Sequence, residues 1–175
     1  MKQQSTGLQR ARETAPPKFV TVDEILDRMK QVYDSIAHRA FEIFESHGQM
    51  FRRDLADWLQ AESELLHPIH LDVAETENTL TVRAEVPGFS AKEIEISLEP
   101  HRLTIAGKRE SKEERKTGKI IYYRERCSDQ VFRMLELPVE VDAAKVTATL
   151  KDDVLELEMP KAAAAKKVRI EPKTT

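Results

Sequence analysis

Residues 80–107 read LTVRAEVPGFSAKEIEISLEPHRLTIAG, and this stretch decides the fold. Apolar residues occupy every second position in three short runs, which are Leu80, Val82 and Ala84, then Ile94, Ile96 and Leu98, then Leu103 and Ile105. A period of two places alternate side chains on the same face of a β-strand. Pro87-Gly88 and Glu99-Pro100 separate the runs and are typical of turns. The stretch therefore predicts short strands, each apolar on one face.

The same period continues on both sides of this stretch. It recurs at Ile69, Leu71 and Val73, and again at Val146, Ala148, Leu150, Leu155, Leu157 and Met159. Prolines at positions 68, 87, 100, 138 and 160 fall between the runs, where a missing backbone N–H costs little. We therefore expect a mainly β protein, with an immunoglobulin-like β-sandwich over residues 68–160.

Before the sandwich the period changes to 3.6 residues. Between Thr21 and His47 apolar residues recur at three- and four-residue spacings, which predicts an amphipathic helix. Thr21 and Glu24 form a capping box, and Gly48 supplies a C-terminal stop. Asp34-Ser35 marks the point at which an interruption of this helix is expected.

A second helix is expected from Asp54, a good N-cap residue, to the His67-Pro68 pair. Two amphipathic helices joined by a short turn predict a helical hairpin over residues 21–67. The polar residues 1–20 are expected to be a disordered lead-in, and residues 161–175 a flexible C-terminal tail, because neither segment has enough apolar residues for a core.

The composition excludes several functional classes. The chain has 175 residues, with 28 Lys and Arg against 31 Asp and Glu, so no nucleic acid partner is expected. Its five glycines lie too far apart for a phosphate-binding loop. Apolar runs are far shorter than the roughly 20 residues of a membrane helix, and the first residues lack the apolar core of a signal peptide. The single cysteine, Cys127, fits a reducing compartment, so we expect a cytoplasmic protein without a membrane partner.

No motif predicts catalysis or metal binding. His67 and His70, with Glu62 or Asp72, are the nearest approach to a ligand set, but they straddle Pro68, where no regular element fixes their geometry. No nucleophile has a base placed beside it by a motif. We therefore expect neither an enzyme nor a cofactor.

Five segments together resemble the α-crystallin domain of small heat shock proteins. They are residues 84–89 (AEVPGF), 103–109 (LTIAGKR), 132–138 (FRMLELP), 148–155 (ATLKDDVL) and 168–170 (VRI). Asp153 stands where the family usually has glycine, and Asp takes the left-handed conformation only at some cost. The tail motif is V-x-I where I-x-I is common, a methylene smaller, which weakens docking by about 0.8 kcal/mol.

The helical half resembles a short bacterial segment of unknown function. The matching residues are Ile36-Ala37, Ala40-Phe41, Gly48 and Asp57 to Glu62. This resemblance implies no activity. It indicates a module fused in front of the sandwich.

The family resemblance implies an ATP-independent molecular chaperone that binds unfolding proteins, prevents their aggregation and works as a homo-oligomer built from strand-exchanged dimers. The alternative is a non-chaperone interaction adaptor that uses the sandwich as a docking module. The features that discriminate are an exchange strand and a V-x-I tail.

The exchange strand is expected after the charged segment Lys108–Lys119. The residues assigned to dimer strand exchange are Ile120, Ile121, Tyr122, Tyr123, Arg124 and Arg133. By resemblance, the strand pairs with the first strand of a partner subunit, and Arg133 meets an acidic group across the interface. The alternatives are that the strand pairs within its own subunit and that Arg133 is solvated.

Val168 and Ile170 stand two residues apart, so in an extended tail both side chains point the same way. We expect them to enter a groove between two strands. The residues assigned to that groove are Ile94, Ile96, Leu98, Val146, Ala148 and Leu150.

Client binding is assigned to the helical half, which is rich in aromatic residues. The candidates are Phe19, Tyr33, Phe44 and Phe51. Phe41 and Trp58 are expected to pack the hairpin against itself. The alternative is that all these aromatic residues do so.

Overall fold

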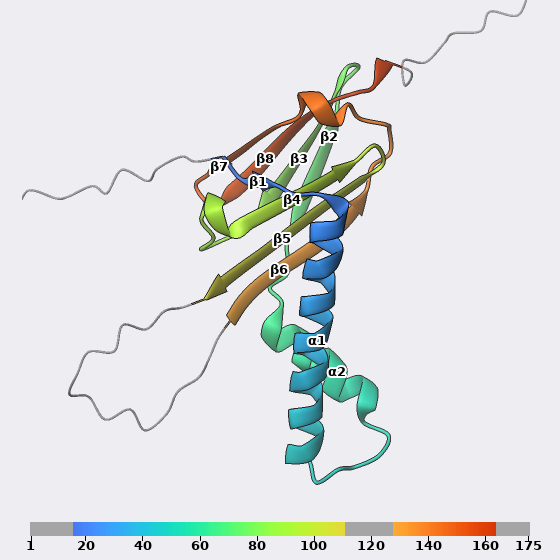
Figure 1. Ribbon diagram of the computed structural model, residues 1–175, viewed down its shortest axis with the longest axis vertical. Helices are drawn as coiled ribbons and strands as arrows, with labels where there is room; N and C mark the ends of the chain where they lie inside the picture. Colours follow the sequence, from blue (N-terminus) through green and yellow to red (C-terminus); the bar gives the residue numbers. More distant parts are fainter. Residues whose placement is uncertain (1–15, 111–127, 164–175) are drawn as a thin grey trace, which may run out of the picture.

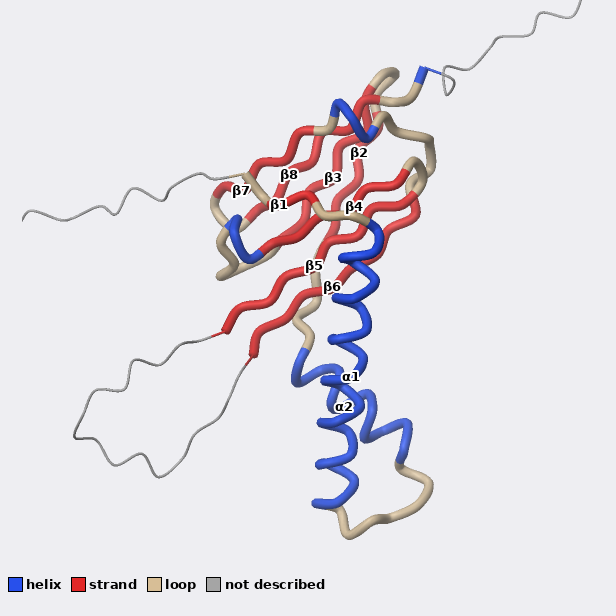
Figure 2. Tube along the Cα trace, in the orientation of Figure 1, coloured by secondary structure: helices blue, strands red, loops and turns tan. Residues whose placement is uncertain are grey.

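The computed structural model describes residues 16–110 and 128–163, which form two four-stranded β-sheets and two α-helices (Figure 1). The elements are β1 (Lys18–Phe19), α1 (Val22–Ser46), α2 (Asp54–Leu65), β2 (Leu71–Glu75), β3 (Thr79–Glu85), β4 (Ile94–Glu99), β5 (Arg102–Glu110), β6 (Ser128–Glu136), β7 (Thr147–Lys151) and β8 (Val154–Pro160), with 3-10 turns at Ala91–Glu93 and Ala143–Lys145. The sheets have the orders β1-β4-β5-β6 and β2-β3-β8-β7 (Figure 2). The predicted sandwich with two preceding helices is confirmed.

The two sheets share one apolar core built from alternate strand positions. Its buried residues are Ile69, Leu80, Val82, Ala84, Val86, Phe89, Ile94, Ile96, Leu103, Ile105, Val131, Leu137, Val141, Leu155, Leu157 and Met159. Gly107 on β5 leaves room for the side chains of its neighbours on β4 and β6, because a Cβ there would lie 2.7 Å from Val131 Cγ2 and 2.9 Å from Ile94 Cδ1.

Helix α1 begins at the predicted capping box. The Thr21 N–H donates to Glu24 Oε2 at 2.8 Å, and the Glu24 N–H donates to Thr21 Oγ1 at 3.3 Å. The expected interruption at Asp34-Ser35 is wrong, because the helix is continuous for 25 residues. There the Asp34 carboxylate pairs with Lys30 at 3.1 Å, and the Ser35 hydroxyl donates to Gln31 O at 2.8 Å, so both side chains are satisfied within the helix.

The helices cover the outer face of the β1-β4-β5-β6 sheet. Helix α1 contacts β4 and β5, and α2 contacts β6. On β4 and β5 the outward-facing Ser97, Thr104 and Ala106 are small and buried, whereas on β6 Phe132 is partly buried against the helices and Met134 is exposed. Arg28 fixes α1 on the sheet, donating from Nε and Nη2 to the two carboxylate oxygens of Glu95, each at 2.9 Å. A face that a plain sandwich leaves to water is therefore interior here.

The end of the lead-in differs from its expectation. Lys18 pairs with Glu95 and Phe19 with Ile96 in a parallel register, and the Val20 N–H donates to Ile96 O at 2.9 Å. Residues 16–20 are therefore an ordered strand segment, because the edge of β4 offers backbone groups that need partners. Residues 1–15 lie outside the described part of the chain.

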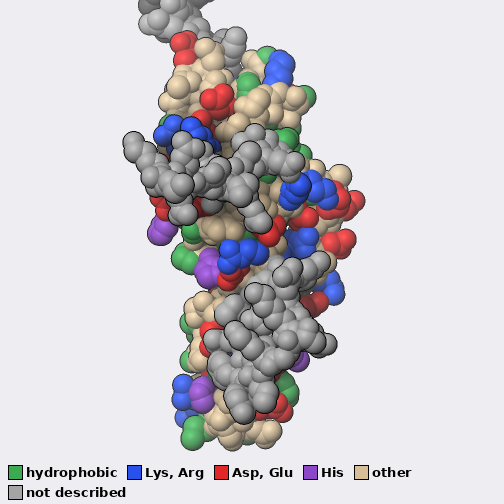
Figure 3. Space-filling model, turned by 90° about the vertical axis from the view of Figure 1, so that its left-hand side faces the viewer, with side chains coloured by type: hydrophobic (Ala, Val, Ile, Leu, Met, Phe, Trp, Pro, Cys, Tyr) green, Lys and Arg blue, Asp and Glu red, His purple; other side chains and the backbone are tan. Residues whose placement is uncertain are grey.

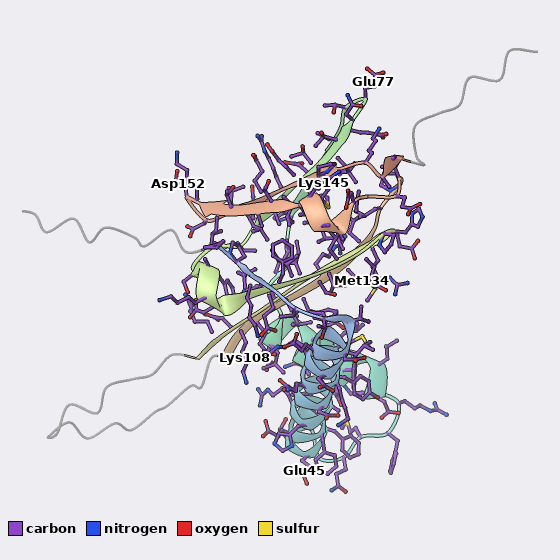
Figure 4. The ribbon with its side chains drawn as sticks, turned by 45° about the horizontal axis from the view of Figure 1, so that its top comes forward. Glu45, Glu77, Lys108, Met134, Lys145 and Asp152 are labelled. Carbon is purple, nitrogen blue, oxygen red and sulfur yellow. The ribbon has the colours of Figure 1, made fainter. Side chains whose placement is uncertain are left out.

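The turn between β7 and β8 carries the predicted left-handed aspartate. Asp152 and Asp153 have φ of 50° and 63°, which is the two-residue turn that suits strand twist. Asp153 also accepts from two neighbouring backbone groups, with Val86 N–H on its carbonyl at 2.8 Å and Gly88 N–H on Oδ1 at 3.3 Å. Figure 4 shows Asp152 at the tip of this hairpin.

We predict that Asp153→Gly stabilises the protein by about 0.5–1 kcal/mol, because glycine removes the left-handed strain at the loss of one long hydrogen bond. Asp153→Ala should destabilise it by about 1 kcal/mol, since alanine retains the strain and lacks the acceptor. Thermal unfolding of the three proteins would show shifts of a few degrees in opposite directions. Equal losses in both variants would assign the effect to the hydrogen bond alone.

Candidate functional site

The residues assigned to the tail groove come together in the structure. Ile94 and Ile96 are fully buried in the shared core, and Leu98, Val146, Ala148 and Leu150 are partly buried against it. A docking segment can therefore reach the last four directly, whereas the two isoleucines form the floor behind them. Val168 and Ile170 themselves lie outside the described residues.

The β4 side of this groove is occupied by the chain's own β1. Figures 1 and 4 both show β1 running along β4 on the side of β7. Pro17 is buried there, and Phe19 keeps 45% of its surface exposed. Sequence reasoning missed this contact, since two paired residues after two prolines carry no periodic signal.

Residues 16–67 pair with part of each outer edge of the β4-β5-β6 sheet. At the far edge, Leu66 forms a parallel bridge with Gln130 of β6, and the His67 N–H donates to Gln130 O at 2.9 Å. Strand β2, by contrast, pairs only with β3 among the described residues, and Val73 on it is exposed. The edge of β2 is thus open to a further strand.

Arg133 lies on β6 opposite Ile105 of β5. Its neighbours on the same face, Val131 and Leu135, are buried and half-buried, while Arg133 is exposed. Within the described ranges, Arg133 forms no ion pair. The residues from Ile120 to Arg124 fall in the undescribed segment 111–127.

A polar cluster links the end of β5 to the start of β6, the two strand ends that flank residues 111–127 in the sequence. Asp129 of β6 accepts from His67 Nε2 at 2.8 Å and forms an ion pair with Arg109 of β5. Arg109 also donates to Gly88 O at 2.9 Å and lies 5.9 Å from the centroid of the Phe89 ring. The hydrogen bond from His67, with the bond and charge of Arg109, lowers the pKa of Asp129, and burial opposes this shift.

Exposed apolar side chains are concentrated on the helical module. The large ones in the described ranges are Phe19, Val22, Leu26, Met29, Tyr33, Phe41, Met50, Phe51, Leu55, Leu59, Val73 and Met134. Ten of these twelve precede residue 60. On the face in Figure 3, by contrast, basic and acidic side chains are interspersed.

The aromatic candidates differ in how far they face solvent. Phe51 is 84% exposed, and Tyr33, 59% exposed, packs on the half-buried Trp58 with ring centroids 5.1 Å apart. Phe44 is half-buried between the rings of Phe41 and Phe51, at 6.3 and 6.2 Å. Phe41, which was expected to pack the hairpin against itself, contacts the Phe44 ring of the same helix and keeps 56% of its surface exposed.

Asp57 joins the two helices from inside. It is 2% exposed, its Oδ1 lies 3.2 Å from His47 Nδ1 at the end of α1, and its Oδ2 has no partner. Sequence reasoning quoted Asp57 only as part of a resemblance. Asp57 is one of four acidic residues in α2, so its residue type did not mark it as buried.

Residues 16–110 and 128–163 contain neither a group of metal ligands nor a membrane-spanning helix. No three His, Cys, Asp or Glu side chains in that part of the chain are grouped to hold a metal ion. No helix in it has the length and apolar character needed to cross a bilayer.

Comparisons with known proteins match the two halves separately. The model of the Hsp20/alpha crystallin family matches residues 72–173. A family described as protein of unknown function (DUF2934) matches residues 31–67. Both resemblances read from the sequence are confirmed.

Individual relatives carry the same description. Small heat shock protein C2 of Rickettsia felis is 32% identical over 58% of this chain and 66% of its own length. Spore protein SP21 of Stigmatella aurantiaca is 36% identical over 57% of this chain and 59% of its own. The chain thus spans about three fifths to two thirds of these relatives. A solved small heat-shock protein from Xylella fastidiosa is 27% identical, with a TM-score of 0.43 over 62% of this chain and 98% of that one.

We predict that Asp129→Asn lowers stability near pH 7 by about 1 kcal/mol, because it removes a charged acceptor from His67 and Arg109. Since the folded pKa of Asp129 is depressed, its contribution is present above about pH 4 and is lost as the pH falls through the folded value. The deficit of the variant, measured by urea unfolding, should therefore shrink below pH 4.

Glu77→Gln, a neutralisation in the exposed β2–β3 turn labelled in Figure 4, is the matched control and should change little at either pH. A deficit of Asp129→Asn that persists unchanged at pH 3 would assign the loss to packing instead of charge.

Proposed function

Because this chain belongs to the Hsp20/alpha crystallin family, we propose that it is an ATP-independent molecular chaperone that binds unfolding proteins and prevents their aggregation. The observation that carries the proposal is the apolar surface of the helical module. Ten large apolar side chains from Phe19 to Leu59 are exposed there, on a fold whose core is otherwise well covered. Exposed apolar surface of this extent is typical of a protein-binding face.

Holding an unfolding protein on such a surface needs no nucleotide and no chemistry. Burial of apolar area on both partners supplies about 25 cal/mol per Å², without directional bonds. Aromatic and methionine side chains suit this role because they adapt to irregular partners. Tyr33, Phe44, Phe51 and Phe19 are the client-binding residues of this proposal, and the protein is not an enzyme.

The proposed working form is an oligomer built from strand-exchanged dimers. The open edge of β2 has room for one more strand, and residues 120–126 of a partner subunit would pair there through backbone hydrogen bonds. Arg133 supports a subunit contact beside β6. It lies between Val131 and Leu135 on the core-facing side of β6, where a cation gains from an acidic partner.

Tails would join dimers into the larger assembly. Val168 and Ile170 of one subunit would dock against Leu98, Val146, Ala148 and Leu150 of another, over the floor made by Ile94 and Ile96. We place this assembly in the cytoplasm, where the lone Cys127 stays reduced.

We predict that the double variant Tyr33→Ser and Phe51→Ser loses protective capacity. Each lost aromatic contact weakens client binding by about 1 kcal/mol, so the two losses together should raise the amount of protein needed for equal protection about thirtyfold. The measurement is light scattering of a heated model enzyme with increasing amounts of the full chain.

The matched control is Tyr33→Phe with Phe51→Leu, which keeps the apolar area and should keep the protection. Circular dichroism verifies that both variants retain their helices. Full protection by the serine variant would reject the helical module as the client surface, and absence of protection by the unaltered chain would reject the chaperone itself.

We predict that Arg133→Ala loosens the dimer by about a hundredfold, because a symmetric dimer loses one charged hydrogen bond from each of its two subunits. Analytical ultracentrifugation over a dilution series gives the dissociation constant. Arg83→Ala is the control, because Arg83 pairs with Glu156 of its own subunit at 2.6 Å and is exposed. A constant unchanged by Arg133→Ala would make Arg133 a surface residue.

A further inference from the structure

The edge of β4 holds an extended segment of its own chain, and the geometry of that segment is that of a bound strand. Lys18 and Phe19 continue the β4-β5-β6 sheet in parallel register, and Val20 extends the contact with a backbone bond of 2.9 Å to Ile96 O. The backbone groups of β4 around Glu95 and Ile96 are thus already paired on this side. A second strand cannot pair with these two residues at the same time.

The side chains of this segment also lie on the core-facing side of the sheet. Phe19 lies opposite Ile96, a core-facing residue, so its ring is on the groove side of the sheet. Pro17, two residues earlier, is buried. Pro17 and Phe19 therefore repeat the spacing of Val168 and Ile170, two apolar side chains separated by a basic residue.

We propose that residues Pro17–Val20 are an internal ligand of the β4–β7 groove, which an incoming tail from a second copy must displace. This inference rests on the proposed function for the tail as the competing ligand. The position of Pro17–Val20 on the edge of β4 is supported by contacts between described residues alone.

The contacts that keep this segment on β4 come from the adjacent start of α1, so the segment can compete with an incoming tail. Helix α1 starts two residues after Val20. Its Arg28 donates a hydrogen bond to Glu95, the residue of β4 that pairs with Lys18. Lys18 also lies 3.8 Å from Glu24 in the first turn of α1. The start of the helix therefore delivers the segment to β4 and limits how far it can leave.

The contact is also small enough to be reversible. It comprises two paired residues, and Phe19 is only partly covered. When an internal segment competes for a site, the apparent affinity of the external ligand falls in proportion to the fraction of open sites. Tail docking would thus be coupled to the position of the N-terminal end of α1, and an interaction that draws this end away from β4 would favour docking by the same factor.

The test uses the full chain with Val168→Asp and Ile170→Asp, so that its own tails do not compete. A labelled synthetic peptide with the sequence of residues 164–175 is titrated in by fluorescence anisotropy. Adding Phe19→Asp should tighten peptide binding about tenfold, because it opens the groove. Phe41→Asp, the same change at an exposed ring on the far half of α1, should leave the affinity unchanged.

Hydrogen exchange of residues 94–99 is measured on the same proteins and reports the internal ligand without the peptide. Phe19→Asp should speed exchange in β4, and Arg28→Met, which removes the grip on Glu95 while keeping the side-chain length, should do so to a smaller degree. Faster exchange with no peptide binding in any variant would uphold the internal ligand and reject tail docking. Equal peptide affinity and equal exchange in the Phe19→Asp variant and its parent would overturn the proposal.

Discussion

A β-sheet has two edges whose N–H and C=O groups need partners, and this constraint organises the whole chain. Residues 16–67 meet it for one of the two sheets. They start as β1 on the edge of β4, cross the outer face as α1 and α2, and end where Leu66 and His67 bond to Gln130 on the edge of β6. The helical module is therefore a strap around one sheet, anchored at both sides. The other sheet retains β2 and β7 as its outer strands.

Helix α1 lies close to the sheet because the outward-facing side chains beneath it on β4 and β5 are small. Ser97, Thr104 and Ala106 point outward from β4 and β5, and each is buried under the helices although none is large. Large side chains at these positions would hold α1 away from the sheet and lengthen the distance from Thr21 to β4. The Arg28–Glu95 pair then adds a charged contact at the point where helix and edge strand meet. Covering the face thus leaves the apolar surface of the module, from Leu26 to Leu59, turned toward solvent.

Periodicity predicted most of the architecture, since one buried face imposes alternation on each strand and a three-and-four spacing on each helix. The left-handed Asp153 was expected from the family resemblance, which implies glycine at that position. The strand formed by Lys18 and Phe19 was not, because its existence depends on a distant edge and not on its own composition. Ser97, Thr104 and Ala106 did carry a signal, as three small residues facing outward, where long polar ones are usual.

The strap also divides the labour between the two sheets. The chain's own residues pair with part of each edge of the β4-β5-β6 sheet, and in the described part of the chain β2 of the opposite sheet pairs only with β3, which is why β2 is the edge proposed for a strand from another copy. The proposed groove lies between β4 and β7, where Ile94 and Ile96 are buried and Val146, Ala148 and Leu150 are partly buried against the same core. Any segment that enters there must compete with Pro17–Val20, which are continuous with the helix that carries the exposed apolar side chains. Occupancy of the groove and the position of that apolar surface are thus linked through the first turn of α1.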